Sequence, residues 1–385
     1  MSDGFFGGPG GGRDLRIKEK FFEFNWGLLL LLIAIASMGF AMLYSVADGN
    51  WDPWATRQII RFCMGVVILF VVAFVDVRVW MSLAYPAYAV SLLLLVGVEL
   101  IGFKGMGAQR WINLGFMQLQ PSELMKITLI LALARYFHAL TSEQVSRIRF
   151  VIPPLIMIGV PMALVLKQPD LGTALLLAVV GISLFFLAGL AWRYFIVAGI
   201  AVMGAIPVIW SRLHDYQKQR VLTFMDPESD PLGAGYHILQ SKIALGSGGL
   251  FGKGFMQGTQ AHLNFLPEKH TDFIFTMLAE ELGLVGAMTL MVLYLMVLLF
   301  GITVGLQTRN QFGRLVALGV VVNFFLYIFI NIAMVMGLLP VVGVPLPLVS
   351  YGGTAMLTLM LGFGLLMCVY IHRNMEINRN PTSFW

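Results

Sequence analysis

The chain has 385 residues, of which 58% are hydrophobic and only 12% are charged, and its mean hydropathy is +0.83. Soluble domains carry about 25% charged residues, so this composition excludes a water-soluble globular enzyme, a disordered chain and a nucleic-acid-binding protein. Two cysteines are too few for a disulfide scaffold. The composition therefore predicts a polytopic membrane protein.

Apolar stretches, bounded by charged residues, glycine or proline, make up most of the chain. A bilayer core of about 30 Å requires roughly 20 apolar residues for one crossing helix. We therefore predict an all-α polytopic membrane protein with about ten transmembrane helices. The predicted helices lie near residues 27–47, 59–75, 79–102, 123–140, 150–166, 171–190, 193–210, 273–305, 314–337 and 353–372.

These helices make one predicted transmembrane domain over residues 25–372. Residues 1–24, rich in glycine, are expected to form a flexible tail, and residues 373–385 a second tail. The segment 211–272 lacks a sustained apolar run and is predicted to be one long loop.

A short amphipathic helix is predicted within this loop, over residues 235–245. Tyr236, Leu239 and Ile243 share one helical face, and polar side chains occupy the other. We expect this helix to lie in the membrane surface.

The lysines and arginines of the short loops predict the orientation of the chain. With the N-terminus inside, the outer short loops keep few basic residues, and both termini are expected in the cytoplasm, with 211–272 facing outwards. The net charge of +5 reflects this topology and indicates no anionic partner such as nucleic acid. The basic residues assigned to the cytoplasmic side are Arg13, Arg16, Lys18, Lys20, Arg78, Arg147, Arg149, Arg193, Arg309, Arg314, Arg373 and Arg379.

Four segments of the predicted outer side depart from plain apolar sequence, and the first is 104–126. Pro121 suits the first turn of a helix, and Glu123 and Lys126 then lie three residues apart on one face of it. They could form a solvated ion pair at a capped helix end. Alternatively, because an apolar run follows directly, they could line a cavity below the membrane surface.

The second and third segments each place a carboxylate before an apolar run. Asp170 follows Pro169 in a tight polar connection and could cap the next helix. Asp272 ends the long loop, where it or Thr271 could equally be an N-cap.

The fourth segment, 343–354, contains two prolines and three glycines and is nevertheless quite apolar. Irregular backbone at membrane depth is tolerated only against protein or a water-filled cavity. This segment is therefore predicted to be the structured wall of a site.

Together these segments resemble the signatures of the SEDS family (shape, elongation, division and sporulation). The resemblance covers nearly the whole chain from about residue 25, in the order of the family. Residues 235–260 and 263–272 look closer to its rod-shape branch than to its division branch. The matching motifs are Arg110-Trp111-Ile112, Gln120-Pro121-Ser122-Glu123, Gln168-Pro169-Asp170-Leu171-Gly172-Thr173, Pro267-Glu268-Lys269-His270-Thr271-Asp272-Phe273 and Pro345-Leu346-Pro347-Leu348-Val349-Ser350-Tyr351-Gly352-Gly353.

The resemblance implies a bacterial inner-membrane glycosyltransferase of ten helices whose active site faces the periplasm. Such proteins polymerise lipid II into β-1,4 glycan strands during cell elongation. They work with a class B penicillin-binding protein that crosslinks the strands, and with other proteins of the elongation complex.

The family motif assigns the general base to Asp272, which would deprotonate the attacking sugar hydroxyl in an inverting displacement. The departing diphosphate needs cations or a metal. Glu123 and Asp170 could orient such cations or help bind Mg²⁺ or Mn²⁺, although no cofactor is firmly implied. The candidate substrate-binding residues are Arg110, Glu123, Lys126, Asp170, Arg220, Lys242, Lys269 and Ser350.

Two other functions stay open on the sequence alone. One is a flippase for the lipid-linked precursor, which needs a path through the bilayer, although few charges lie deep in the predicted spans. The other is a non-catalytic scaffold that recruits the crosslinking enzyme. A pure scaffold would have no need for carboxylates and cations gathered on one face.

Overall fold

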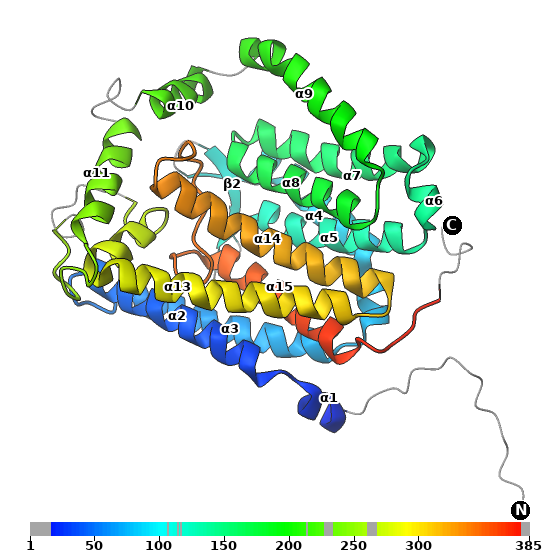
Figure 1. Ribbon diagram of the computed structural model, residues 1–385, viewed down its shortest axis with the longest axis horizontal. Helices are drawn as coiled ribbons and strands as arrows, with labels where there is room; N and C mark the ends of the chain where they lie inside the picture. The colour runs from blue at the N-terminus through cyan, green and yellow to red at the C-terminus, as the bar shows by residue number, and fades with distance from the viewer. Residues whose placement is uncertain are drawn as a thin grey trace, which may run out of the picture.

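Each predicted apolar stretch folds as a helix in the computed structural model, which describes residues 17–105, 108–113, 115, 118–212, 215–226, 234–259 and 268–378. Figure 1 shows the arrangement of the elements. In chain order they are α1 (Ile17–Glu23), α2 (Trp26–Val46), α3 (Ala55–Phe74), α4 (Val77–Ile101), β1 (Phe103–Gly105), β2 (Ala108–Asn113), β3 (Gln118–Leu119), α5 (Pro121–His138), α6 (Ser142–Val145), α7 (Ile148–Lys167), α8 (Leu171–Leu187), α9 (Trp192–Arg212), α10 (Asp215–Met225), α11 (Ala234–Ser247), α13 (Ile274–Gln307), α14 (Gln311–Val335) and α15 (Gly353–Ile371).

Within the described residues, seven helices are long and apolar enough to cross a membrane: α2, α3, α4, α7, α13, α14 and α15. The apolar parts of α8 and α9 are shorter, and α5 carries Glu123, Lys126 and Arg135 within its 18 residues. The chain thus has the helices of a multi-pass membrane protein. The count of about ten spans and the domain limits stay predictions.

The centre of the bundle is formed by α5, α14 and α15. Of the apolar windows of the spanning helices, 83% of that in α15 and 67% of that in α14 are buried, against 22% in α4. α14 packs against α5, α8, α13 and α15, and the buried residues of α5 include Glu123 and Lys126. The charged pair therefore lies inside the bundle, away from the lipid-facing surface.

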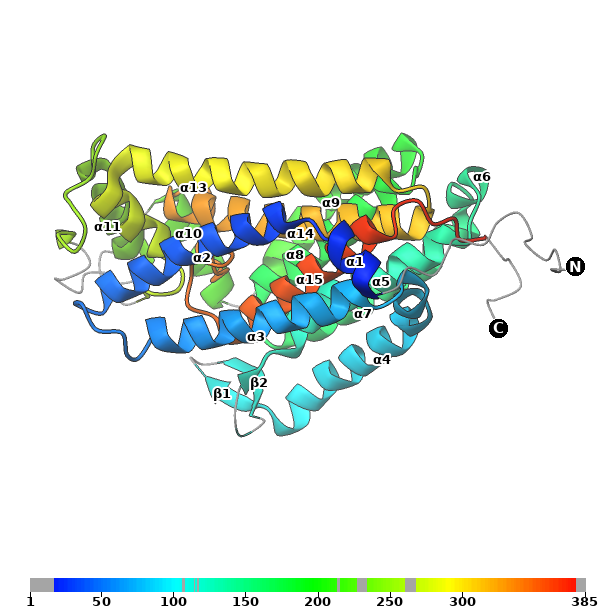
Figure 2. The same ribbon diagram turned by 90° about the horizontal axis from the view of Figure 1, so that it is seen from below.

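The expectation of an all-α fold was wrong for the segment between α4 and α5. There β1, β2 and β3 form an antiparallel sheet, with Phe103 opposite Trp111 and Ile112 opposite Leu119. Aromatic and β-branched residues favour strands, and the pairing satisfies backbone groups that a plain turn would leave open. This sheet carries Arg110, at the same end of the bundle as α11 (Figure 2).

The amphipathic helix predicted over 235–245 forms as α11, but its buried face is not the one that carries Leu239 and Ile243. Ile238, Ser241 and Ala244 are buried, whereas Leu239 and Ile243 are exposed. The Ser241 hydroxyl pairs with the Thr276 hydroxyl at 2.8 Å and donates to the Val335 carbonyl at 2.9 Å. Leu239 and Ile243 therefore point away from the protein, and the location of α11 in the membrane surface stays a prediction.

The first and last described helices meet at the opposite end of the bundle (Figure 2). Arg373, just beyond α15, pairs with Glu23 of α1 at 3.2 Å, and the Lys20 amine donates to the Phe74 carbonyl at 2.8 Å. Both described ends of the chain therefore lie on one side, as the even number of predicted spans requires. Which side this is stays a prediction.

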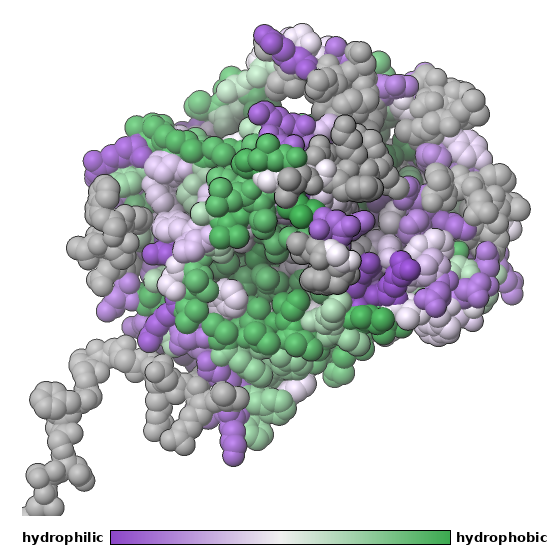
Figure 3. Space-filling model, turned by 180° about the vertical axis from the view of Figure 1, so that it is seen from behind, coloured by the Kyte–Doolittle hydropathy of each residue, from purple (hydrophilic) through white to green (hydrophobic). Residues whose placement is uncertain are grey.

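α9 leaves the bundle after its first turn, where the Tyr194 hydroxyl donates to the Ser146 carbonyl at 2.7 Å. Beyond it, Ile196, Ile200 and Met203 are exposed, and the helix runs apart from its neighbours in Figure 1. On the face seen in Figure 3, a broad apolar area lies between more polar margins. These surfaces suit contact with lipid.

Candidate functional site

Glu123 and Lys126 form a buried ion pair at the start of α5, with 2.6 Å between Lys126 Nζ and Glu123 Oε1. Pro121 occupies the first turn of the helix, as predicted. The Tyr327 hydroxyl of α14 donates to Glu123 Oε2 at 2.5 Å and also contacts Lys126 Nζ. Because the Lys126 side chain is only 1% exposed, the structure excludes a solvated pair and favours ionisable groups buried in the bundle.

Asp170 and Arg110 join the second predicted segment to the sheet. Asp170 Oδ1 accepts from the Thr173 amide at 3.1 Å, so Asp170 caps α8 as its position suggested. Arg110 Nε lies 3.8 Å from Asp170 Oδ2, and its guanidinium also donates to the carbonyls of Gln168 and Pro169. Asp170 thus combines a capping role with an electrostatic one.

Gln120, the N-cap residue of α5, contacts both Asp170 before α8 and Thr354 of α15. Its side-chain amide reaches Asp170 Oδ2 at 3.5 Å, and its backbone amide donates to the Thr354 hydroxyl at 3.3 Å. Asp170 also lies within electrostatic range of Tyr327. The N-termini of α5, α8 and α15 therefore converge, and the positive ends of their dipoles favour a bound anion.

Asp272 lies just before α13, in a turn beside the fourth predicted segment. Helix α13 begins at Ile274 and its N-cap is Phe273, so neither Asp272 nor Thr271 is the N-cap that the sequence allowed. Asp272 is partly buried, and its Oδ2 lies next to Gly343, 3.4 Å from the position that a Cβ would take there. The segment 343–352 is non-helical, as predicted.

Lys269 is buried, and it interacts electrostatically with Asp48 of the α2–α3 turn. Burial lowers the pKa of Lys269, and the Asp48 carboxylate opposes that shift. Residues 268–273 form turns, so Lys269 and Asp272 do not share a regular helical turn. The Asp48 carboxylate therefore favours the charged form of Lys269.

Ser350 was predicted to bind substrate, but its hydroxyl serves the backbone. Ser350 Oγ donates to the Thr271 carbonyl at 2.6 Å and accepts from the Leu346 amide at 2.7 Å. Its single hydrogen is therefore already used. The residue ties the segment 343–352 to the turn that carries Asp272.

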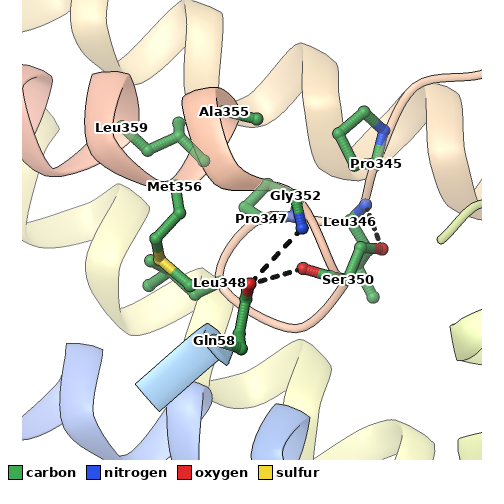
Figure 4. A pocket seen from close by; sticks show the side chains of 10 residues that line it. All are labelled: Gln58, Pro345, Leu346, Pro347, Leu348, Ser350, Gly352, Ala355, Met356 and Leu359. Carbon is green, nitrogen blue, oxygen red and sulfur yellow. Dashed lines mark hydrogen bonds between the residues drawn. The ribbon is translucent and has the colours of Figure 1, made fainter. Parts of the chain in front are cut away.

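A small pocket lies behind this segment, against α3 and the first turns of α15 (Figure 4). Gln58 of α3 lines it and holds the segment from below: its amide donates to the Ser350 carbonyl at 2.8 Å and accepts from the Gly352 amide at 3.4 Å. The other lining side chains, such as Leu348 and Met356, are mostly apolar. The pocket therefore lies between the segment 343–352 and the helices that support it, α3 and α15.

Of the remaining two predicted cations, only Lys242 has a described side chain, and it lies outside this group. Lys242 is exposed on α11, and its aliphatic stem lies against Gly337, just after α14. Arg220 falls on α10, and its side chain lies outside the described part of the chain.

Sequence reasoning missed the uncharged polar residues of the site. Tyr327 and Asn331 of α14, Gln58 of α3 and Thr358 of α15 all contact the predicted segments from within apolar helices. A lone polar side chain in a predicted span is a usable signal, because such groups are costly in a membrane unless they are bonded.

The predicted divalent cation stays a prediction. Glu123 already contacts Lys126 with one oxygen and Tyr327 with the other, and Asp170 holds Thr173 and faces Arg110. Among the described residues, no group of three or more His, Cys, Asp or Glu side chains could hold a metal ion. In this arrangement the two carboxylates do not fit a metal site.

The chain is similar to known proteins over nearly its whole length. Residues 22–375 match the family model of the FtsW, RodA and SpoVE cell cycle proteins. The peptidoglycan glycosyltransferase MrdB of Escherichia coli K12 is 47% identical over 357 residues, which cover 90% of this chain and 94% of MrdB.

Two solved structures are similar over most of their length. One comes from a study of how a peptidoglycan synthase complex coordinates polymerization and crosslinking, and matches with a TM-score of 0.81 and 33% identity over 92% of this chain and 99% of that chain. The other, the rod shape determining protein RodA of Thermus thermophilus, matches with a TM-score of 0.70 and 30% identity over 92% and 98%. The chain therefore belongs to the FtsW, RodA and SpoVE family of cell cycle proteins.

Proposed function

We propose that this chain is a peptidoglycan glycosyltransferase that polymerises lipid II into β-1,4 glycan strands on the periplasmic face of the bacterial inner membrane. The observation that carries the proposal is the gathering of Asp272, the Glu123–Lys126 pair and the Arg110–Asp170 pair at one end of a membrane-spanning bundle. The names of the similar proteins, peptidoglycan glycosyltransferase among them, support the same activity.

The reaction is an inverting displacement at the anomeric carbon of one lipid-linked sugar. The 4-hydroxyl oxygen of the other sugar forms the new bond, its proton passes to the Asp272 carboxylate, and the carbon–oxygen bond to the diphosphate breaks with both electrons on the diphosphate. A hydroxyl is a weak nucleophile, and a positioned base of this kind contributes about 10²–10⁴-fold.

Charge on the departing diphosphate is met by fixed positive groups. The N-termini of α5, α8 and α15 supply oriented backbone amides. Lys126 is only 1% exposed and is held by Glu123 and Tyr327, so its positive charge acts on the diphosphate through the low-dielectric interior rather than by direct contact. Arg110 adds a cation whose side chain is 29% exposed and so within reach of a ligand.

The lipid tail of the substrate needs apolar surface that opens to the bilayer. The exposed apolar residues of α9, and those of α11 within the long loop, supply such surface. A class B penicillin-binding protein, with other proteins of the elongation complex, is the proposed partner. Support comes from the similar structure, which belongs to a study of how a peptidoglycan synthase complex coordinates polymerization and crosslinking.

The flippase alternative has less support in this fold. Arg135, one of the few charges deep in a predicted span, donates to the carbonyls of Met81 and Ser82 at 3.0 Å. Its guanidinium is therefore bonded to the backbone of α4 and is not free to line a transport path.

The test is polymerisation of labelled lipid II by the purified chain, alone and with its cognate penicillin-binding protein. We expect glycan strands in at least one of the two conditions. Absence of polymer in both, with flipping of a fluorescent lipid precursor in liposomes, would replace the polymerase by a flippase. Absence of both activities would leave the scaffold.

A further inference from the structure

Three hydrogen bonds, accepted by the backbone carbonyls of three successive residues, hold the turn that carries Asp272. The His270 carbonyl accepts from the Tyr351 amide at 2.9 Å, and the Thr271 carbonyl accepts from Ser350 Oγ at 2.6 Å. The Asp272 carbonyl accepts from Asn331 Nδ2 at 3.0 Å. Two of these donors belong to the wall segment 343–352, and the third is a side chain of α14. We call residues 270–272 the strap.

Asn331 joins the strap to the wall. Its amide nitrogen donates to the Asp272 carbonyl and, at 2.7 Å, to the Val344 carbonyl. Because both acceptors are carbonyls, only the NH₂ group can face them, and the orientation of the amide is fixed. The side chain is 0% exposed, so water does not compete for these bonds.

The oxygen of the Asn331 amide shows that this side chain is not optimised for stability alone. Asn331 Oδ1 is buried and has no hydrogen-bond partner. A buried acceptor without a donor is destabilising. What the side chain supplies in return is a rigid link between α14, the wall and the backbone of the proposed base.

We infer that Asn331 is a positioning residue for the glycosyl transfer, acting on Asp272 through the carbonyl of that residue. This rests on the proposed function of Asp272 as general base. A base must lie within hydrogen-bond reach of the hydroxyl it deprotonates. Displacement of a reacting group by about 1 Å can cost on the order of 10²-fold in rate.

The matched control is Asn323, which lies on the same helix about two turns earlier. It is also buried, and its Oδ1 likewise has no hydrogen-bond partner. The three donors to the strap come from Asn331, Ser350 and Tyr351. Asn323→Leu and Asn331→Leu therefore make the same chemical change in the same helix, and only the second releases the strap.

The experiment measures kcat and KM for lipid II polymerisation by the full chain in complex with its penicillin-binding protein. We expect Asn331→Leu to lower kcat about 10²-fold, with KM for lipid II unchanged within error, whereas Asn323→Leu keeps the wild-type rate. Asn331→Gln keeps the NH₂ donor but moves it by one methylene. It should also lower kcat, and it serves if Asn331→Leu fails to fold.

The double variant Asp272→Asn/Asn331→Leu separates this inference from the proposed function. A residue that acts through the base has nothing further to lose once the base is gone, so the double variant should be as active as Asp272→Asn alone. A further loss in the double variant, a rise in KM, or equal rates for Asn331→Leu and Asn323→Leu would each overturn the positioning role. Full activity of Asp272→Asn would instead overturn the base itself.

Discussion

Glu123 and Lys126 are two charged side chains that the fold buries on one face of α5. Removing an ion from water costs several kcal/mol, and only close geometry with further hydrogen bonds offsets that cost. Here the 2.6 Å contact is supplemented by Tyr327, and by Thr358, whose hydroxyl lies 3.4 Å from Glu123 Oε2. Either charge left without its partner is therefore strongly destabilising.

Lys126→Met tests this pair. We expect the free energy of unfolding in detergent to fall by about 3–5 kcal/mol, because the Glu123 carboxylate stays buried without its cation. The double variant Glu123→Gln/Lys126→Met removes both charges and should recover part of the loss.

Arg309 and Glu376 supply the control, since that pair is 3.8 Å apart and its side chains are 64% and 71% exposed. Arg309→Met should change the free energy of unfolding by less than about 1 kcal/mol. If Lys126→Met and Arg309→Met both changed the free energy of unfolding by less than about 1 kcal/mol, the burial of the Glu123–Lys126 pair would be contradicted.

At this scale the sequence identifies the charged members of the site and not their uncharged partners. Glu123, Lys126, Asp170 and Asp272 stand out because a charge beside an apolar run is rare. Tyr327 and Asn331 do not, since only the packing of α14 against α5 and the wall gives them partners. Ser350 is conspicuous in sequence, but its role depends on a carbonyl that is distant in the chain.

The loop after α11 packs closely against the backbone of α13. Gly252 has a φ of +79°, and a Cβ there would lie 2.1 Å from the Glu281 carbonyl oxygen of α13. Met256 donates its amide to Glu281, and Lys253 pairs with Glu280 at 2.7 Å. The loop is therefore fixed across the start of α13, which follows the strap.

Gly252→Ala should destabilise the protein, because both the positive φ and the neighbouring carbonyl oppose a side chain. Gly246, within α11, is the control: a Cβ there meets nothing within 4 Å. Gly246→Ala should raise the free energy of unfolding by about 0.5–1 kcal/mol, the usual gain for alanine over glycine in a helix. Thermal unfolding of the two variants should move in opposite directions, and a stabilised Gly252→Ala would refute the close approach.

The spacing of apolar residues predicted where the helices lie better than it predicted which helices pack together. All the apolar stretches became helices, and α11 formed where Tyr236, Leu239 and Ile243 predicted an amphipathic helix. The face that packs on α13 could not be read from hydrophobicity, because in a membrane the small residues of a helix face protein and the large ones face lipid. The sheet was missed because its strands are only two to six residues long.

For the whole molecule, the arrangement separates two ends of the bundle. The strap, the sheet and α11 lie at one end, and α1 and the residues after α15 lie at the other (Figure 2). The basic residues of the sequence predict that the second end faces the cytoplasm. The geometry alone is consistent with either direction.

Cysteine labelling in whole cells distinguishes the two directions. In a background of Cys63→Ala and Cys368→Ala, Ser247→Cys at the end of α11 should react with a membrane-impermeant maleimide added outside. Arg309→Cys, in the exposed turn between α13 and α14, should react only after the inner membrane is opened. The reverse pattern would invert the predicted topology.

The central claim is that Asp272 is the base of a lipid II polymerase, and one comparison tests it most directly. The rate of glycan-strand formation is measured for Asp272→Asn and for Glu268→Gln, each in complex with the penicillin-binding protein. Glu268 is the carboxylate four residues earlier in the same turn, where it accepts from the Thr271 hydroxyl at 2.9 Å. Asp272→Asn should be slower by about 10²–10⁴-fold, and Glu268→Gln should stay near the wild-type rate. A folded, partner-bound Asp272→Asn variant that polymerises lipid II at the wild-type rate would contradict the account.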